Sequence, residues 1–150
     1  MTRKFLLDTN VLIALTEAGH IHHQNAQNWL NSSGEHEWGI CPLTEMGFLR
    51  ITTNSKSYPN PRTFGLAIAI LEMVKAFPGF CYWEIKDSWV ALTAPFASRI
   101  SGHQQVTDAY LLGLAIKEDG MLVTFDRGVA YMAGDEYRQN VQLLGARPAA

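Results

Sequence analysis

The sequence predicts an α/β fold, a three-layer α/β/α sandwich with a central, mostly parallel sheet. Short apolar segments alternate along the chain with segments of helical periodicity, which is the pattern of strands connected by helices. The apolar segments lack a regular polar alternation, as is typical of strands that helices cover on both faces. No internal repeat or linker divides the 150 residues, so we expect one domain over residues 1–150.

The first half of the chain contains clear signals for the start and end of its elements. The expected elements are a strand at 5–7, helices at 10–18 and 22–30, a strand at 38–41 and a helix that starts at Pro42. Gly19 can end the first helix, because glycine readily adopts the left-handed conformation that commonly closes a helix. Proline suits the first turn of the last helix, where its missing N–H is not needed.

The second half begins with the clearest loop, NSKSYPNPR at 54–62, which has two prolines and little apolar character. The elements expected after it are a helix at 63–75, a strand at 80–85, a weak helix at 89–97, a helix at 107–119 and strands at 121–124 and 141–144. Thr107 and Gly120 are suitable caps for the helix between them. The last residues, about 145–150, have the composition of a flexible tail.

Composition and charge limit the function. A net charge of −2 and a pI of about 6.2 argue against a protein that coats nucleic acid nonspecifically, because such binding needs a basic surface. The sequence contains no motif of a dinucleotide, NTP, esterase or zinc-protease site. No apolar stretch is long enough to cross a bilayer, and Asp8 interrupts the only run that resembles a signal peptide, so a cytoplasmic location is expected.

Four carboxylates fall at the ends of expected elements. Asp8 and Asp126 each follow a strand. Glu45 and Asp108 each lie in the first turn of a helix. Each acid has an ordinary structural explanation, since an acid after a strand often caps the next helix and an acid in a first turn favours the helix dipole. In a parallel α/β sheet, however, ligands bind beyond the carboxyl ends of the strands, where such acids lie.

Small polar residues accompany all four acids. They are Thr9 and Asn10 beside Asp8, Thr44 beside Glu45, Thr107 beside Asp108, and Thr124 near Asp126. Hydroxyl and amide groups in these positions suit hydrogen bonds that orient a carboxylate. Capping explains each acid separately, but it does not explain this shared pattern.

Convergence of the four carboxylates would require a counter-charge. Two unit charges about 4 Å apart repel by about 4 kcal/mol at an effective dielectric constant of about 20, and several such pairs would rival the whole stability of a small domain. Such a cluster must bind a proton or hold a cation, and oxygen ligands favour Mg²⁺ or Mn²⁺. Ions held in this way commonly act on phosphates, so the residues predict metal-assisted hydrolysis of phosphodiester bonds.

The same segments resemble the motifs of the PIN-domain ribonucleases and, among them, the VapC-type toxins of toxin–antitoxin pairs. The matching segments are LLDTNVLIAL, PLTEMGFLRI, VTDAYLLGLA and LVTFDRG, in this order along the chain. The resemblance implies a PIN-like α/β/α fold and a Mg²⁺- or Mn²⁺-dependent endoribonuclease that inhibits translation. It also implies an RNA substrate, a homodimer, and a cognate VapB-type antitoxin that occupies the acidic pocket.

The resemblance also assigns roles to individual residues. By motif match the catalytic residues are Asp8, Glu45, Asp108 and Asp126, and the supporting residues are Thr9, Asn10 and Thr124. Asp8 and Asp108 are the first choice as metal ligands, while Glu45 and Asp126 are expected to bind directly or through water. Many relatives have another acid or amide two positions after the last acid, where this chain has Gly128. One ion would then bind strongly and a second only with the substrate.

Some alternatives remain open at this point. Arg50 and Arg127 are candidates for binding RNA, but the first can belong to an ordinary solvated surface and the second can pair with a surface acid. A PIN-like module without catalysis that binds RNA or protein is a second possibility, and it would be expected to lose some of the acids. A hydrolase with an aspartyl nucleophile usually needs a second Asp where this chain has Asn10.

Overall fold

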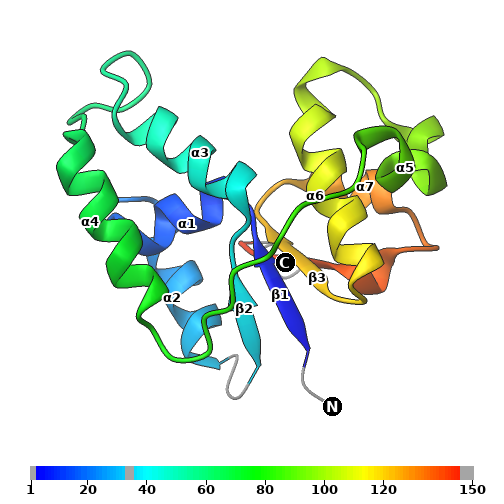
Figure 1. Ribbon diagram of the computed structural model, residues 1–150, viewed down its shortest axis with the longest axis horizontal. Coiled ribbons are helices and arrows are strands. Elements are labelled where there is room, and N and C mark those ends of the chain that lie inside the picture. Colours follow the sequence, from blue (N-terminus) through cyan, green and yellow to red (C-terminus); the bar gives the residue numbers. More distant parts are fainter. Residues whose placement is uncertain (1–2, 33–35, 146–150) are drawn as a thin grey trace, which may run out of the picture.

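The computed structural model describes residues 3–32 and 36–145, so all but the first residue of the expected tail at about 145–150 lies outside the described residues (Figure 1). In chain order the elements are β1 (Lys4–Leu7), α1 (Thr9–Thr16), α2 (His23–Ser32), β2 (Glu37–Gly39), α3 (Pro42–Thr52), α4 (Phe64–Lys75), α5 (Trp89–Thr93), the 3-10 helices η1 (Ala94–Arg99) and η2 (His103–Gln105), α6 (Val106–Lys117), β3 (Met121–Thr124), α7 (Arg127–Ala133), the 3-10 helix η3 (Arg138–Asn140) and β4 (Val141–Leu143). None of the helices in this part of the chain is long and apolar enough to cross a membrane.

The four strands form one sheet in the order β2-β1-β3-β4. All three neighbouring pairs are parallel, and Leu6 in β1 lies between Gly39 of β2 and Leu122 of β3. Because the strands are parallel, their carboxyl ends meet at one edge of the sheet. The segments that follow β1 and β3, which carry Asp8 and Asp126, therefore leave the sheet at the same edge.

Helices cover both faces of the sheet, as Figure 1 shows. Side chains alternate along a strand, so Phe5 and Leu7 pack with α1–α4 while Leu6 packs with α5–α7. In β3, Val123 belongs to the first group and Leu122 to the second. Both faces are buried, which explains why the strands read as continuous apolar runs. The predicted three-layer α/β/α sandwich is confirmed.

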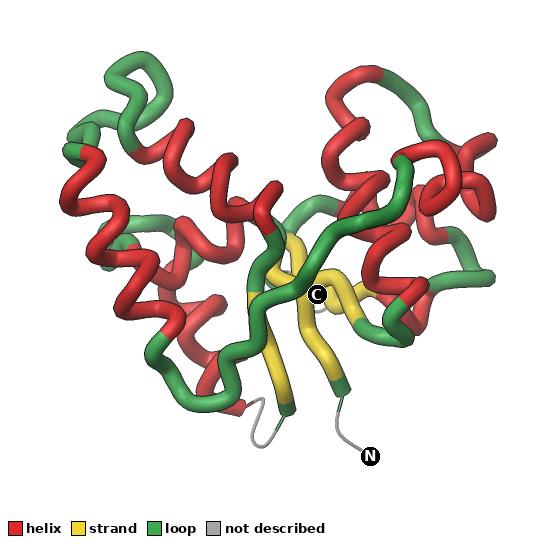
Figure 2. The backbone as a smooth tube through the Cα atoms, in the orientation of Figure 1, coloured by secondary structure: helices red, strands yellow, loops and turns green. Residues whose placement is uncertain are grey.

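The expected strand at 80–85 is wrong. Only Phe80 forms a bridge, with Trp38 of β2, and the following residues pass along the edge of the sheet as the loop that crosses in front of it in Figure 2. The N–H of Cys81 donates to the carbonyl of Trp38 at 2.8 Å, and the N–H of Trp83 donates to that of Ile40 at 2.9 Å. The segment pairs with a strand of three residues and then turns away to α5, which leaves too few contacts for a strand of its own.

Gly39 makes the close approach of this segment to β2 possible. A Cβ atom placed at Gly39 would lie 1.6 Å from the carbonyl oxygen of Cys81. No side chain fits in that space, so glycine is required here.

A helix that the sequence analysis did not include, α7, follows β3. Asp126 caps it by accepting a hydrogen bond from the N–H of Gly128 at 2.8 Å. The helix buries Val129 and Met132 against the face of the sheet that also contacts α5 and α6. Seven residues are too few for a clear helical periodicity, and glycine lowers the helix propensity of the first turn.

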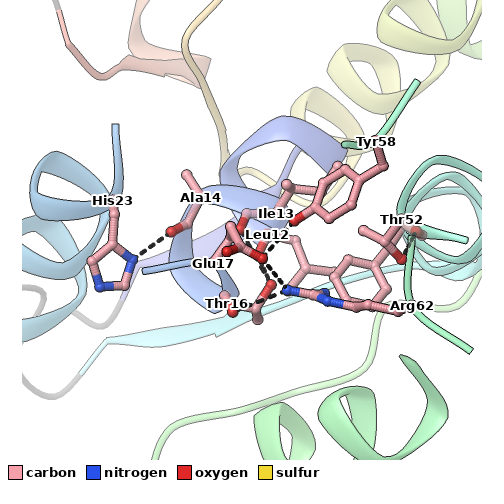
Figure 3. A network of polar contacts seen from close by, with 10 residues as sticks. Leu12, Ile13, Ala14, Thr16, Glu17, His23, Thr52, Tyr58 and Arg62 are labelled. Atoms are coloured by element: carbon pink, nitrogen blue, oxygen red, sulfur yellow. Dashed lines mark hydrogen bonds and ion pairs between the residues drawn. The ribbon is translucent and has the colours of Figure 1, made fainter. Parts of the chain in front are cut away.

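The loop at 54–62 is attached to the end of α1 through a buried arginine (Figure 3). Arg62 Nη2 donates to Glu17 Oε2 at 2.9 Å and to the carbonyl of Thr16 at 3.2 Å, and its side chain is only 7% exposed. The hydroxyl of Tyr58 donates to the same oxygen of Glu17 at 2.8 Å. One of these bonds satisfies the carbonyl of Thr16 at the carboxyl end of α1, the helix whose amino end is capped by Asp8.

Candidate active site

Asp8 lies at the carboxyl end of β1 and caps α1. Its Oδ1 accepts a hydrogen bond from the N–H of Thr9 at 2.7 Å, and its Oδ2 accepts one from the hydroxyl of Thr124 at 2.9 Å. The residue is only 6% exposed. An ionised carboxylate has about four lone-pair sites, so acceptor capacity remains on both oxygens.

Thr124 connects two of the predicted acids. It is fully buried at the end of β3, the strand next to β1, so its hydroxyl reaches Asp8 across the sheet. The same hydroxyl oxygen accepts a hydrogen bond from the N–H of Asp126 at 3.1 Å. The side chain of Thr124 therefore fixes the orientation of Asp8 and the start of the turn that carries Asp126.

Asp108 enters the same region from the first turn of α6. Burial of its carboxyl group, followed by the negative charges of Asp8 and Asp126, raises its pKa from 3.8 to about 7. Burial also raises the pKa of Asp8, and the charge of Asp126 adds to this effect, while the hydrogen bonds from Thr124 and Thr9 oppose it. Three acids from three separate elements thus lie close enough for their charges to repel one another.

Glu45 has different surroundings. Its Oε2 forms an ion pair with Lys75 Nζ at 2.7 Å, and its Oε1 accepts a hydrogen bond from the hydroxyl of Tyr82 at 3.0 Å. Thr44, the preceding residue, donates to the carbonyl of Leu7 at 2.8 Å and holds the start of α3 at the end of β1. The backbone of Glu45 is therefore near the edge of the sheet where Asp8, Asp108 and Asp126 lie, which we call the acidic edge. The charge of the Glu45 side chain, however, is neutralised by Lys75.

The other predicted site residues vary in position. The hydroxyl of Thr9 faces α3, where a Cβ atom placed at Gly47 would lie 2.7 Å from it. Asn10 is exposed in the first turn of α1. Arg50 and Arg127 are also exposed, and neither forms an ion pair within residues 3–32 and 36–145.

The acids can be tested for their fit to a divalent cation. Among the described residues, no three or more histidine, cysteine, aspartate or glutamate side chains are arranged to hold one ion together. Mg²⁺ is usually bound by one or two carboxylates, several waters and the phosphates of a substrate. Asp8 and Asp108 fit such a site as a pair, because burial and repulsion raise the pKa of both and a cation would offset the repulsion.

Sequence reasoning missed the groups that surround these acids. Lys75 and Tyr82 lie on α4 and on the loop after it, and no spacing rule connects them to Glu45. Gln105 lies in the polar segment before Asp108 and lines a pocket next to Asp126. The position of this glutamine three residues before an acid was the one available signal.

The three-layer α/β/α fold and the acids at one edge of its sheet are the features expected of a PIN domain, and comparison with known families agrees with this expectation. Residues 5–135 match the PIN domain family, so the chain belongs to the PIN-domain proteins. Two relatives are ribonucleases of Mycobacterium tuberculosis. Ribonuclease VapC38 is 39% identical over 139 residues, which span 93% of this chain and 96% of the relative. Ribonuclease VapC44 is 37% identical over 128 residues, which span 85% and 89%, respectively.

Solved structures with low sequence identity share the fold. VapC20 of Mycobacterium tuberculosis, described as a sarcin-ricin loop cleaving toxin, has a TM-score of 0.63 and 14% identity, over 87% of this chain and 95% of that chain. VapBC2 of Rickettsia felis, solved with a DNA fragment from its promoter, has a TM-score of 0.61 and 13% identity, over 94% and 98%. Both likenesses support the predicted PIN-like fold.

Proposed function

We propose that this chain is a Mg²⁺- or Mn²⁺-dependent endoribonuclease that acts as the toxin of a toxin–antitoxin pair. One observation carries the chemical part of the proposal: Asp8, Asp108 and Asp126 converge at one edge of the sheet, where partial burial and the charges of the other two acids raise the pKa of Asp108 to about 7. The family and the relatives named ribonucleases support RNA as the substrate. A PIN-like module without catalysis would not need acids that repel one another at the edge of its sheet, one of them, Asp8, buried.

Asp8 and Asp108 are the proposed direct ligands, with Glu45 and Asp126 acting directly or through water. Bound Mg²⁺ or Mn²⁺ supplies charge stabilisation of the phosphoryl group and lowers the pKa of a coordinated water. The chain itself supplies orientation. Thr9 and Thr124 hold both oxygens of Asp8, which leaves this buried carboxylate few other rotamers.

Asp108 couples proton release to cation binding. In the metal-free chain a group with a pKa of about 7 is partly protonated near neutral pH. A bound cation would favour the ionised carboxylate, so binding of Mg²⁺ or Mn²⁺ would release this proton to solvent. Asp126 is exposed and uses Oδ1 to cap α7, so its Oδ2 is available to a water or to the substrate.

We also propose a protein partner, a VapB-type antitoxin, together with a homodimer. An apolar groove of about 250 Å³ lies between α1, α2 and α4, and its lining includes Leu15, Ile70 and Phe77. Two lining residues are exposed to an unusual extent for apolar side chains, Met73 at 65% and Phe77 at 52%. Apolar residues of an antitoxin would cover this surface.

The decisive experiment measures cleavage of RNA by the purified protein. We expect labelled oligoribonucleotides to be cut with Mg²⁺ or Mn²⁺ and to stay intact in excess EDTA. Asp8→Asn removes a proposed ligand but keeps the shape of the side chain, and it should abolish cleavage. Activity that persists in chelator would contradict the metal-dependent mechanism. Growth arrest on expression, relieved by co-expression of the product of a neighbouring gene, tests the toxin assignment.

A further inference from the structure

A polar pocket beside the acids is formed largely by residues that have no role in the mechanism described above. Its volume is about 560 Å³, and it is lined by Asp126 and by the segment from Ser101 to Gln105. This segment comprises a turn and the 3-10 helix η2 that leads into α6. The pocket is therefore connected both to Asp126 and to the helix that carries Asp108. A volume of this size is within the range of small-molecule sites.

Hydrogen bonds fix the orientation of the Gln105 side chain. The N–H of Ser101 donates to Gln105 Oε1 at 2.7 Å, and the hydroxyl of Ser101 donates to the same oxygen at 3.0 Å. A backbone N–H can only donate, so the atom that faces it must be the oxygen of the amide. The nitrogen consequently faces the opposite direction and cannot exchange places with the oxygen.

The Gln105 amide nitrogen points toward the acidic edge. A Cβ atom placed at Gly128 would lie 3.2 Å from Gln105 Nε2 and 3.0 Å from Asp126 Oδ1. Both groups therefore lie next to Gly128, and a side chain at this position would crowd them. Gln105 presents two N–H donors there, while its acceptor is occupied by Ser101.

The charge of the pocket favours an uncharged ligand group. Asp126 contributes a negative charge, which disfavours a phosphate inside the pocket. The amide donors of Gln105 match a carbonyl oxygen. Among the nucleobases, guanine presents a carbonyl oxygen, O6, beside N7 at one edge, and uracil presents the carbonyl oxygen O4. Adenine presents N7 beside an amino donor at this edge and cytosine presents an amino donor, so neither offers a carbonyl oxygen there.

We propose that this pocket binds the nucleobase next to the cleaved phosphodiester, with Gln105 donating to a base carbonyl, so that guanine or uracil is preferred over adenine or cytosine. This inference rests on the proposed function, since it assumes an RNA strand at the acidic edge. Gln105 is then a residue that determines sequence specificity, and Ser101 is the positioning residue that orients it.

Sequencing of the ends of cleaved RNA tests the proposal. We expect the wild-type protein to cut a random oligoribonucleotide pool with guanine or uracil at one flanking position. Gln105→Ala should reduce this preference by about tenfold while cleavage of the other sequences persists. Gln139→Ala is the matched control, because Gln139 is exposed in the separate 3-10 helix η3. An unchanged base preference in Gln105→Ala would overturn the proposal.

A binding measurement separates this proposal from the nuclease assignment. The side-chain NH₂ signals of Gln105 are identified by their loss in the Gln105→Ala NMR spectrum, and the wild-type protein is titrated with each of the four nucleoside monophosphates. Shifts with GMP or UMP, and not with AMP or CMP, support the pocket even if no cleavage is found. Equal responses to all four, or no response, would contradict it. Comparison of GMP with UMP identifies which base is bound.

Discussion

The hydroxyl group of Thr124 donates a hydrogen bond of 2.9 Å to Asp8 Oδ2 across the junction of β1 and β3. Both residues are buried, so water cannot replace the bond if the hydroxyl is lost. The same oxygen accepts from the N–H of Asp126. A single side chain thus joins two of the acids to the central part of the sheet.

Replacement of Thr124 by valine should affect both stability and metal binding. The variant keeps the shape of the side chain but leaves Asp8 with one partner, so we expect a loss of about 1–3 kcal/mol in the free energy of unfolding. Affinity for Mn²⁺ should fall by about 10- to 100-fold, because the ligand is no longer oriented. Urea unfolding and titration calorimetry measure the two effects.

Thr52→Val is the matched control for this experiment. Thr52 is equally buried, and its hydroxyl donates to the carbonyl of Phe48 at 2.8 Å, far along α3 from the acids. The control should change stability without changing Mn²⁺ affinity. Equal losses of affinity in both variants would show that Thr124 acts through general stability.

The contribution of Asp108 to the stability of the metal-free protein should fall as pH rises from about 4 to about 7. Asp108 has a pKa of about 7 in the folded chain and an ordinary value of 3.8, so within this range the folded state holds more protons than the unfolded state. Each additional proton held by the folded state changes the free energy of unfolding by at most about 1.4 kcal/mol per pH unit, and solvent screening reduces this change. Thermal unfolding in EDTA across this range should show a flatter slope for Asp108→Asn. A slope that is identical in the variant would contradict the assigned cause.

Removal of the charge should reduce Mn²⁺ affinity more at Asp8 or Asp108 than at Glu45. Asp8→Asn and Asp108→Asn should each weaken Mn²⁺ binding by at least about tenfold, because each removes a proposed direct ligand. Glu45→Gln should change Mn²⁺ affinity much less, since Lys75 already neutralises this carboxylate. Titration calorimetry on the three variants checks this order, and an equal loss for Glu45→Gln would show that this acid leaves the lysine and binds the ion.

Gly39→Ala should prevent normal folding. The new Cβ would lie 1.6 Å from the carbonyl oxygen of Cys81, so β2 and the neighbouring segment would have to separate. Gly65→Ala is the control, because its Cβ would have no neighbour closer than 4.0 Å, and the change should stabilise α4 by about 0.5–1 kcal/mol. Circular dichroism and thermal melting distinguish the two, and a folded, stable Gly39→Ala protein would contradict the close packing.

Local sequence patterns were sufficient for the elements that have strong signals. The strand at 5–7, the helix that begins at Pro42 and the strand at 121–124 were all expected within one residue of their observed starts. Asp8 and Asp126 do cap the helices that follow them, so their ordinary explanation holds together with their clustering. A capping carboxylate uses only part of its acceptor capacity, and the two roles are therefore compatible.

Long-range contacts could not be read from the sequence. The segment at 80–85 has strand composition, but its pairing partner β2 has only three residues. Lys75 neutralises Glu45 from a helix 30 positions further along the chain, and only the packing of α4 beside α3 brings them together. The orientation of Gln105 depends on a turn at Ser101 that propensity does not specify.

An anomalous difference map from crystals of the protein grown with Mn²⁺ would show directly whether the acids hold a metal ion. We expect a peak between the carboxylates of Asp8 and Asp108, and no peak at that position in crystals of Asp8→Asn. Manganese bound only at other places, or the same peak in the variant, would contradict a metal centre at this edge of the sheet.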